Sequence, residues 1–232
     1  MRRRSEDTKR SRPAWPGVDF SQSAEHEGYE HIAQLLQKLR LHWLLKRFPP
    51  RAVQALYVLV NGFLTIGILA LLAFVTRNPF VFPSVGPTAY LLFFSPLVDA
   101  SSPRNAILGH AIGLICGYAA LHLTGASVSG GLASTVGMHP GIYWPRILAA
   151  AISLSVTGAA MVLFRVSHPP AGATTLIVSL GIISQPLHLL TIEIAVLLLV
   201  LQAFLINRLA GIPYPMWAPN QYDHLRQRIS RG

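Results

Sequence analysis

The chain has 232 residues, of which 52% are hydrophobic and 12% charged, and its formal net charge is +10. Soluble domains carry about 25% charged residues, so this composition excludes an ordinary soluble domain and indicates a membrane domain with polar ends. The basic charge gathers near the chain ends, which indicates membrane topology and attraction to anionic lipid, not nucleic-acid binding. The single cysteine, Cys116, excludes an intramolecular disulfide and a cysteine metal cluster.

Two polar segments precede the apolar part. Residues 1–24 are predicted to form a disordered basic tail, because no apolar stretch follows the first arginines and a secretory signal is therefore not expected. Residues 25–48 are predicted to form an amphipathic helix, with apolar side chains at helical spacing on one face. This helix either lies on the cytoplasmic leaflet or packs on its own membrane domain or on a twin subunit.

The apolar part, residues 51–209, is predicted to be an all-α membrane domain, a helical bundle with four to six transmembrane segments. Two shorter apolar segments begin at prolines. A Gly-, Ser- and Thr-rich loop covers 124–141, and residues 210–232 form an expected cytoplasmic tail. The four long apolar runs are 53–75, 105–123, 147–166 and 187–206, and the short segments are 80–98 and 169–183.

The two short segments resemble one another. Both carry the pattern Pro-x-x-Gly-x-Thr, beginning at Pro83 and Pro169, with an offset of 169 − 83 = 86 residues. The same offset places the long apolar runs of the first half largely on those of the second half. With three segments in each half, the second copy would be inverted relative to the first in the membrane. Paired short segments interrupted by Gly and Pro, in two inverted repeats, are typical of a transporter site near the membrane midplane.

Basic residues near the ends of the spans predict the topology. Lys46, Arg47 and Arg51 place the start of the bundle in the cytoplasm, so both chain termini are expected there and the protein is expected in the cell inner membrane. Six crossings would place Arg77 and Arg146 outside. If the short segments are re-entrant, four crossings result and the 124–141 loop turns inward; the charge bias and the repeat favour six.

Two motifs carry a family resemblance. The sequence Ser167-His168-Pro169-Pro170-Ala171-Gly172-Ala173-Thr174 resembles the signature of the HPP family of integral membrane proteins. Ser102-Pro103-Arg104-Asn105, followed by Gly109-His110, resembles the second recurring patch of that family. The resemblance implies a membrane protein without cofactor, a family usually described with four spans, and a link to nitrite transport.

The duplicated short segments supply the first candidate site residues. A helix that starts at His168 and Pro169 would present unpaired N–H groups, and its dipole would favour an anion there. Gly86 and Gly172 would let a small ion approach the backbone, while Thr88 and Thr174 offer hydroxyls one turn further on. The alternative role of such glycines is close helix packing, which is expected for Gly113, Gly117 and Gly158.

Three side chains with N–H groups complete the candidate site. Arg104 would clamp an oxyanion with its planar guanidinium, or it is only an arginine at the cytoplasmic interface. His110 would give a further hydrogen bond, or it is a neutral histidine bonded to a neighbouring helix. His168 would hold an anion or shuttle a proton, or it only caps the helix. The candidate substrate-binding residues are Ser84, Gly86, Thr88, Arg104, Asn105, His110, His168, Gly172 and Thr174.

These observations predict a transport protein for a small inorganic anion, with nitrite as the first candidate. The alternative is a membrane anchor or assembly module that binds a protein partner through its N-terminal helix. Cation permeation is disfavoured because acidic residues are so few within the spans. We expect no enzyme activity, because the metalloprotease, hydrolase and phosphate-loop motifs do not occur. Membrane lipid is the other expected partner, and a homo-oligomer stays open.

Overall fold

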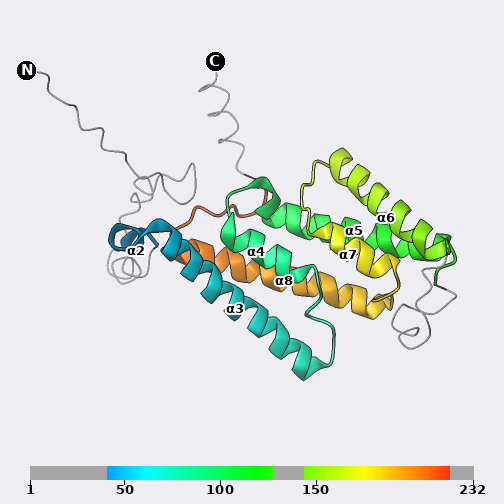
Figure 1. Cartoon of the computed structure of the whole chain (residues 1–232), viewed down its shortest axis with the longest axis horizontal. Coiled ribbons are helices and arrows are strands. Elements are labelled where there is room, and N and C mark those ends of the chain that lie inside the picture. Colours follow the sequence, from blue (N-terminus) through cyan, green and yellow to red (C-terminus); the bar gives the residue numbers. More distant parts are fainter. Residues whose placement is uncertain (1–40, 128–143, 220–232) are drawn as a thin grey trace, which may run out of the picture.

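The structure is a computed structural model that describes residues 41–127 and 144–219, and within these residues all regular elements are helices. Figure 1 shows a bundle in which the short helices lie alongside the long ones. The elements are α2 (Leu41–Arg47), α3 (Pro50–Thr76), α4 (Val85–Phe94), the 3-10 turn η2 (Asp99–Ser101), α5 (Pro103–Leu123), α6 (Trp144–Leu163), α7 (Ala171–Ser179) and α8 (Pro186–Leu209).

Prolines fix where several of these helices begin. Pro50, Pro103 and Pro186 lie in the first turn of α3, α5 and α8, where the missing N–H would have no intrahelical partner. The α5 start has a side-chain cap as well, since the Ser102 hydroxyl accepts a hydrogen bond from the backbone N–H of Asn105. The sequence therefore sets these helix starts locally.

Length separates the helices into two kinds. Within the described residues, α3, α5, α6 and α8 are each long and apolar enough to cross a membrane. The short helices α4 and α7 have 10 and 9 residues. At 1.5 Å per residue each is about 15 Å long, half of the roughly 30 Å hydrocarbon layer. The short helices therefore cannot cross alone.

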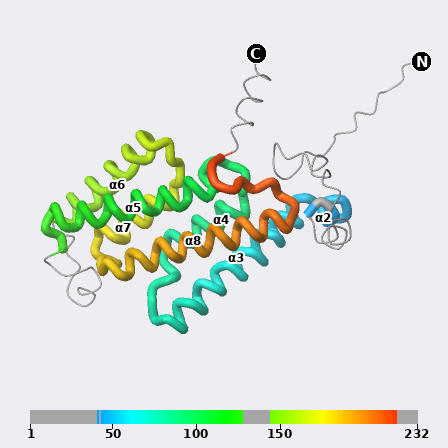
Figure 2. The backbone as a smooth tube through the Cα atoms, turned by 180° about the vertical axis from the view of Figure 1, so that it is seen from behind, coloured from blue at the N-terminus to red at the C-terminus, as the bar shows by residue number. Residues whose placement is uncertain are grey.

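Hydrogen bonds show which helix ends lie together. At the start of α3, the Gln54 side chain bonds to the carbonyl of Phe94, at the end of α4. The first turn of α5 bonds to residues that follow α6 and α8, through Arg104 to the carbonyls of Arg165 and Trp217. All these ends, together with α2, lie at what we call the α2 end of the bundle, which is also visible in Figures 1 and 2.

The chain passes between the two ends of the bundle six times. Because α3 and α5 both start at the α2 end, residues 77–94 must return there, first without helix and then as α4. Because α6 and α8 both finish at the α2 end, residues 164–179 must lead away from it, and they do so as a non-helical stretch followed by α7. A bundle with four membrane-length helices is thus compatible with a chain that passes six times between the two ends of the bundle.

The predicted inverted repeat is present in this path. The short helices start at residues 85 and 171, and α5 and α8 end at residues 123 and 209; both offsets are 86 (171 − 85 and 209 − 123). Corresponding helices of the two repeats run in opposite directions: the chain runs away from the α2 end in α3 and toward the α2 end in α6. The fold is therefore a helical membrane bundle of two inverted three-segment repeats, as the sequence predicts.

The two repeats exchange partners. The short helix α4 packs on α3 and α8, whereas α7 packs on α5 and α6, so each group of three contains two helices of one repeat and one of the other. Figure 1 shows these two groups side by side, joined where α5 contacts α8. The short helices thus belong to different groups.

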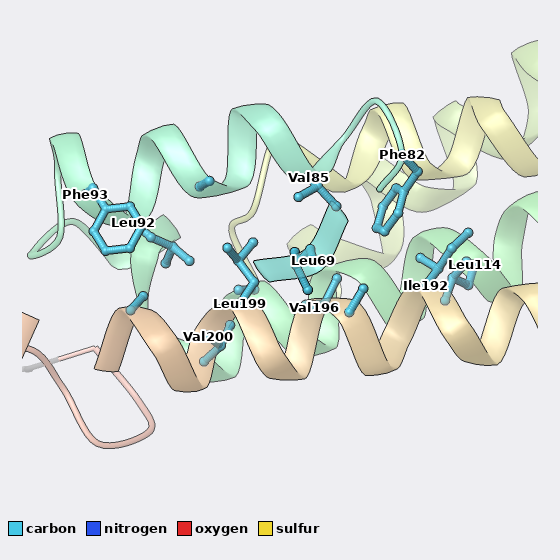
Figure 3. Close-up of a cluster of buried hydrophobic side chains, with 14 of the residues drawn as sticks. Leu69, Phe82, Val85, Leu92, Phe93, Leu114, Ile192, Val196, Leu199 and Val200 are labelled. Atoms are coloured by element: carbon cyan, nitrogen blue, oxygen red, sulfur yellow. The ribbon is translucent and has the colours of Figure 1, made fainter. Parts of the chain in front are cut away.

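A buried apolar cluster lies around α4 and α8 (Figure 3). Leu92 and Phe93 of α4 and Leu199 of α8 are fully buried in it, together with Leu69 of α3. Outward-facing apolar side chains on the long helices are exposed instead, for example Phe63, which is 78% exposed. Apolar side chains on both the inner and the outer surface are what a bundle surrounded by lipid requires.

Both polar flanks meet the α2 end. In α2 the buried Leu41 packs with Val53 and Ile212, so this part of the expected amphipathic helix packs on its own membrane domain. Residues 25–40 of that helix, and the 1–24 tail, lie outside the described residues. The expected C-terminal tail begins differently, because Ile212 and Tyr214 are buried and only the residues after 219 lie outside the described part.

Candidate functional site

The first turns of the two short helices meet inside the bundle. Ser84 precedes α4 and Thr174 lies in the first turn of α7, and their hydroxyl oxygens are 2.6 Å apart. The two helices run in opposite directions from this point, α4 toward the α2 end and α7 away from it (Figure 1). The contact therefore joins the equivalent turns of the two repeats.

Small residues on α5 bring α7 close enough for this contact. A Cβ on Gly113 would lie 2.8 Å from the carbonyl oxygen of Ala171, and one on Gly117 would lie 2.7 Å from that of Thr175. A Cβ on Gly109 would lie 2.7 Å from Cβ of His168. The expected packing role of Gly113 and Gly117 is correct, whereas Gly158 has no atom within 4 Å of its built Cβ.

Five polar side chains form a continuous hydrogen-bonded path at this junction, which we call the Thr/His cluster: Ser84, Thr88, His110, His168 and Thr174. His110 bonds at Nδ1 to the Thr174 hydroxyl (2.7 Å) and at Nε2 to the Thr88 hydroxyl (3.0 Å). The Thr88 oxygen is also 3.3 Å from His168 Nε2. At the other side of its ring, His168 Nδ1 is 2.7 Å from the carbonyl oxygen of Ala100.

The Thr/His cluster is fully enclosed. All five side chains have 0% relative exposure. The ring centroids of His110 and His168 are 5.0 Å apart, and the rings of Phe82 and His110 form a T-shaped pair with centroids 6.4 Å apart. The cluster contains hydroxyl and imidazole groups but no carboxylate, so its polar hydrogens can serve a negatively charged ligand without repulsion from an acid.

The expected unpaired N–H groups are not found at the start of α7. The N–H groups of Ala171, Gly172 and Ala173 donate to the carbonyls of the three residues before them, His168, Pro169 and Pro170. The two prolines have no N–H of their own. The first N–H groups of this helix are therefore already paired, and the hydroxyl and imidazole groups of the Thr/His cluster, which bond to one another, are the other polar groups at this junction.

Arg104 lies away from the cluster. Its guanidinium donates to the carbonyls of Phe164 and Arg165, at 3.1 and 3.0 Å, and to the side-chain oxygen of Asn105. These carbonyls belong to the residues that follow α6. Asn105 in turn donates to the carbonyl of Asp99. In this structure the Pro-Arg-Asn patch ties η2, α5 and the end of α6 together.

The two candidate glycines differ in their surroundings. Gly86 is on the exposed side of α4, and a Cβ there would meet nothing within 4 Å. Gly172 faces Leu154 of α6, whose Cδ1 would be 3.3 Å from the built Cβ. A Cβ on either glycine would have no atom of the Thr/His cluster among its nearest neighbours within 4 Å. Of the nine predicted site residues the structure brings together Ser84, Thr88, His110, His168 and Thr174.

Other polar contacts were not predicted. The Thr157 and Thr175 hydroxyls are 3.1 Å apart between α6 and α7, next to the cluster. At the α2 end, the side chain of Asn207 accepts from the Tyr57 hydroxyl and donates to the carbonyl of Leu92. A polar side chain inside an apolar run was the only available signal for these residues, since their partners are distant in the sequence.

Glu193 and the histidines give no metal centre in the described part of the chain, where three or more His, Cys, Asp or Glu side chains nowhere come together. The buried carboxylate oxygens of Glu193 have no hydrogen-bond partner among the described residues. Glu193 does not pair with Arg104, because Glu193 lies in the early turns of α8 and Arg104 lies at the α2 end.

The inverted repeat, the four long apolar helices and the polar junction of two half-length helices define a multi-pass helical membrane protein. Comparison with known families matches residues 48–215 to the family described as HPP, transmembrane region. The chain therefore belongs to the HPP family of transmembrane proteins, and the match includes all five residues of the Thr/His cluster. No curated protein and no solved structure matches this chain.

Proposed function

We propose that this protein transports a small inorganic anion across the membrane, with nitrite as the first candidate, and that the anion binds at the Thr/His cluster. The observation that carries the proposal is the position of this cluster. It lies where the first turns of two half-length helices meet, inside a bundle of inverted repeats. Discontinuous helices at a repeat interface are the usual site of substrate binding in transporters.

The chemistry of the cluster favours an anion over a cation. Its members offer hydroxyl and imidazole hydrogens, and the described part of the chain contains only two acidic residues, Asp99 and Glu193. Neither appears among the hydrogen-bond partners of the cluster side chains. Charged ligands strengthen such hydrogen bonds, since a bond to an ionised acceptor is roughly twice as strong as a neutral one. Nitrite itself is suggested by the family.

The packing of the helices suggests how the site opens. Ser84 and Thr88 belong to the group of α3, α4 and α8, whereas the other three members of the cluster belong to the group of α5, α6 and α7. Rocking of one group against the other would therefore separate the Ser84 and Thr174 hydroxyls and expose the cluster. Such motion of one bundle against another is the common form of alternating access.

Charge distribution suggests the orientation in the membrane. Of the eight Lys and Arg residues in the described part, six lie at the α2 end and two, Arg77 and Arg146, lie toward the opposite end. Positive residues favour the cytoplasmic side, so we assign the α2 end to the cytoplasm and the protein to the cell inner membrane. The six at the α2 end are Lys46, Arg47, Arg51, Arg104, Arg165 and Arg208.

Uptake by proteoliposomes tests the proposal. Purified protein should increase the uptake of nitrite above that of protein-free liposomes. Thr174→Val keeps the side-chain shape but removes a hydroxyl of the cluster, and we expect the apparent affinity to fall roughly ten-fold, which corresponds to about 1.4 kcal/mol. The matched control is Thr191→Val, because the Thr191 hydroxyl bonds only to the carbonyl of Leu187 in its own helix α8.

One result would count against transport itself, and another would count only against the Thr/His cluster as its site. Folded wild-type protein that moves neither nitrite, nitrate nor chloride would favour the alternative, a membrane anchor without transport. Normal uptake by both Thr174→Val and Thr88→Val would keep transport but remove the Thr/His cluster as the binding site.

A further inference from the structure

We propose that the protein binds one proton together with each anion, and that His168 takes this proton at Nε2. The inference rests on the proposed function and adds the coupled ion to it. Its basis is the hydrogen-bonded path of the Thr/His cluster, in which the hydrogens can be counted one by one.

One nitrogen of His168 has a fixed role. Its Nδ1 lies 2.7 Å from the carbonyl oxygen of Ala100, and a carbonyl oxygen can only accept. Nδ1 therefore carries a hydrogen and donates it. A neutral His168 then has a lone pair at Nε2, and a second proton can add only there.

The hydroxyl hydrogen of Thr88 has two alternative acceptors. It points to the carbonyl oxygen of Ser84, one turn earlier at 2.8 Å, or to Nε2 of His168 at 3.3 Å. When it points to Ser84, the Thr88 oxygen presents a lone pair to Nε2, and this contact is favourable only if Nε2 carries a proton. When it points to His168, the imidazole is neutral. Rotation of one hydroxyl is thus linked to the protonation of His168.

The rest of the path is compatible with both arrangements. One tautomer of His110 fits both arrangements: its Nε2 donates to the Thr88 oxygen and its Nδ1 accepts from the Thr174 hydroxyl. The Thr174 oxygen accepts in turn from the Ser84 hydroxyl. His110 can therefore remain neutral with both ring nitrogens bonded, while the charge of His168 changes.

Several charged or titratable groups lie on the elements around His168. The nearest is the His110 ring on α5, at a centroid distance of 5.0 Å. Arg104 in the first turn of α5 bonds to carbonyl oxygens, and Asp99 lies in η2 beside Ala100. Further along the packed elements are Arg165 just before His168, Arg146 at the far end of α6, His122 at the far end of α5 and the exposed Tyr90 of α4, which stacks on Phe94.

The coupling follows from the cost of burying charge. His168 is fully buried, and the hydrogen-bond partners that the structure gives it are the neutral Ala100 carbonyl and Thr88 hydroxyl. An imidazolium there is expensive without a negative partner, and an anion there is expensive without a positive one. Each of the two ions therefore strengthens the binding of the other, which is a favourable (negative) coupling free energy between two ligands.

The step balances in protons and charge. A proton from water forms the second N–H bond of His168, and the same bond breaks when the proton is released to water on the other side. One proton and one monovalent anion carry no net charge across the membrane together. Uptake should therefore follow a pH gradient and be insensitive to the membrane potential.

The test measures nitrite and protons separately in proteoliposomes that contain a pH-sensitive dye, with the membrane potential clamped by potassium and valinomycin. Protein-free liposomes give the background of nitrous acid that crosses the lipid by itself. We expect protein-dependent acidification of the lumen with about one proton per nitrite. Uptake of nitrite without protein-dependent acidification overturns this inference alone. Absence of protein-dependent nitrite uptake overturns the proposed function and this inference with it.

Three variants locate the proton. In His168→Gln the side chain still forms hydrogen bonds but takes no proton, so the ratio of protons to nitrite should fall from about one toward zero. Thr88→Val should lower the ratio too, and Thr88→Ser should restore it, because serine returns the hydroxyl. His188→Gln, in the first turn of α8, is the matched control with an unchanged ratio. A ratio near one in His168→Gln would overturn the assignment to His168.

Discussion

Thr65 and Thr88 show how differently two buried hydroxyls behave in the same bundle. Both side chains are fully buried, on α3 and α4 respectively. Thr88 contacts a backbone carbonyl and two imidazoles, whereas the Thr65 hydroxyl has no hydrogen-bond partner in the described part of the chain. An unpaired hydroxyl in an apolar interior lowers stability, whereas a hydrogen-bonded one avoids this cost.

The variant Thr65→Val should therefore stabilise the protein by about 1 kcal/mol, because it replaces an unsatisfied hydroxyl by a methyl group of similar size. The opposite sign is expected for Thr88→Val, which leaves its partners unbonded. Thermal unfolding of both variants in detergent measures the difference. A lower midpoint for Thr65→Val than for wild type would show that the hydroxyl has a partner after all.

Gly113 is important because it has no side chain. A Cβ at this position would lie 2.8 Å from both the carbonyl oxygen of Ala171 and the hydroxyl oxygen of Thr175, closer than normal contacts allow. We expect Gly113→Ala to push α7 away from α5 and to cost about 1–3 kcal/mol of stability. Gly62→Ala on α3 is the control, since its built Cβ has nothing within 4 Å. Equal unfolding midpoints for the two variants would contradict this contact.

Two features of the sequence determine where the half-length helices α4 and α7 lie. Proline lies shortly before each start, at Pro83 ahead of α4 and at Pro170 as the N-cap of α7, and packing holds each helix within its own group of three helices. The long helices supply the surfaces on which α4 and α7 pack. In addition, the end of α6 must stay fixed next to the start of α5, so that residues 164–170 reach the junction of the short helices. Arg104 supplies this link, because it bonds to two carbonyl oxygens that no longer have partners in α6.

For this reason Arg104→Ala should lower stability, by about 2 kcal/mol for the loss of hydrogen bonds from a charged donor to carbonyls. The affinity for nitrite should change by less than a factor of about two in the protein that remains folded, since the guanidinium does not touch the Thr/His cluster. Unfolding and uptake are measured on the same preparation. Arg208→Ala removes an arginine of the same end that stacks on Phe204 and serves as the control. Normal stability with a large loss of affinity would restore Arg104 as a ligand of the anion.

As a whole, the molecule follows the sequence prediction in its repeat, whereas the contacts within the Thr/His cluster could not be predicted in the same way. The offset of 86 residues could be found from two short motifs because proline and glycine act locally on the backbone. The direct contact of Ser84 with Thr174, and that of His168 with the Ala100 carbonyl, join residues 90 and 68 positions apart, and no local pattern announces them.

The candidate residues that the structure does not gather show the same limit. The sequence indicates Arg104 and Gly86 by their residue type and motif, but the direction in which each points depends on how its helix packs against its neighbours. Gly86 lies on the exposed side of α4 because the opposite side of this helix, with Val85 and Leu92, packs in the apolar cluster of Figure 3. Sequence reasoning therefore gives the helices and the small-residue contacts more reliably than the direction of a single side chain.

The six passages of the chain make a prediction about the membrane. Leu123 ends α5 at the end opposite to α2, with 86% of its side chain exposed, whereas Met216 follows α8 at the α2 end and is 77% exposed. In a Cys116→Ser background, Leu123→Cys should react with an impermeant thiol reagent added outside intact cells, and Met216→Cys should react only after the cells are opened. If the α4 and α7 segments were re-entrant, four crossings would place both cysteines on the cytoplasmic side, and neither would react from outside. Labelling of Met216→Cys in intact cells would instead reverse the assignment of the α2 end to the cytoplasm, which depends on its six arginine and lysine residues.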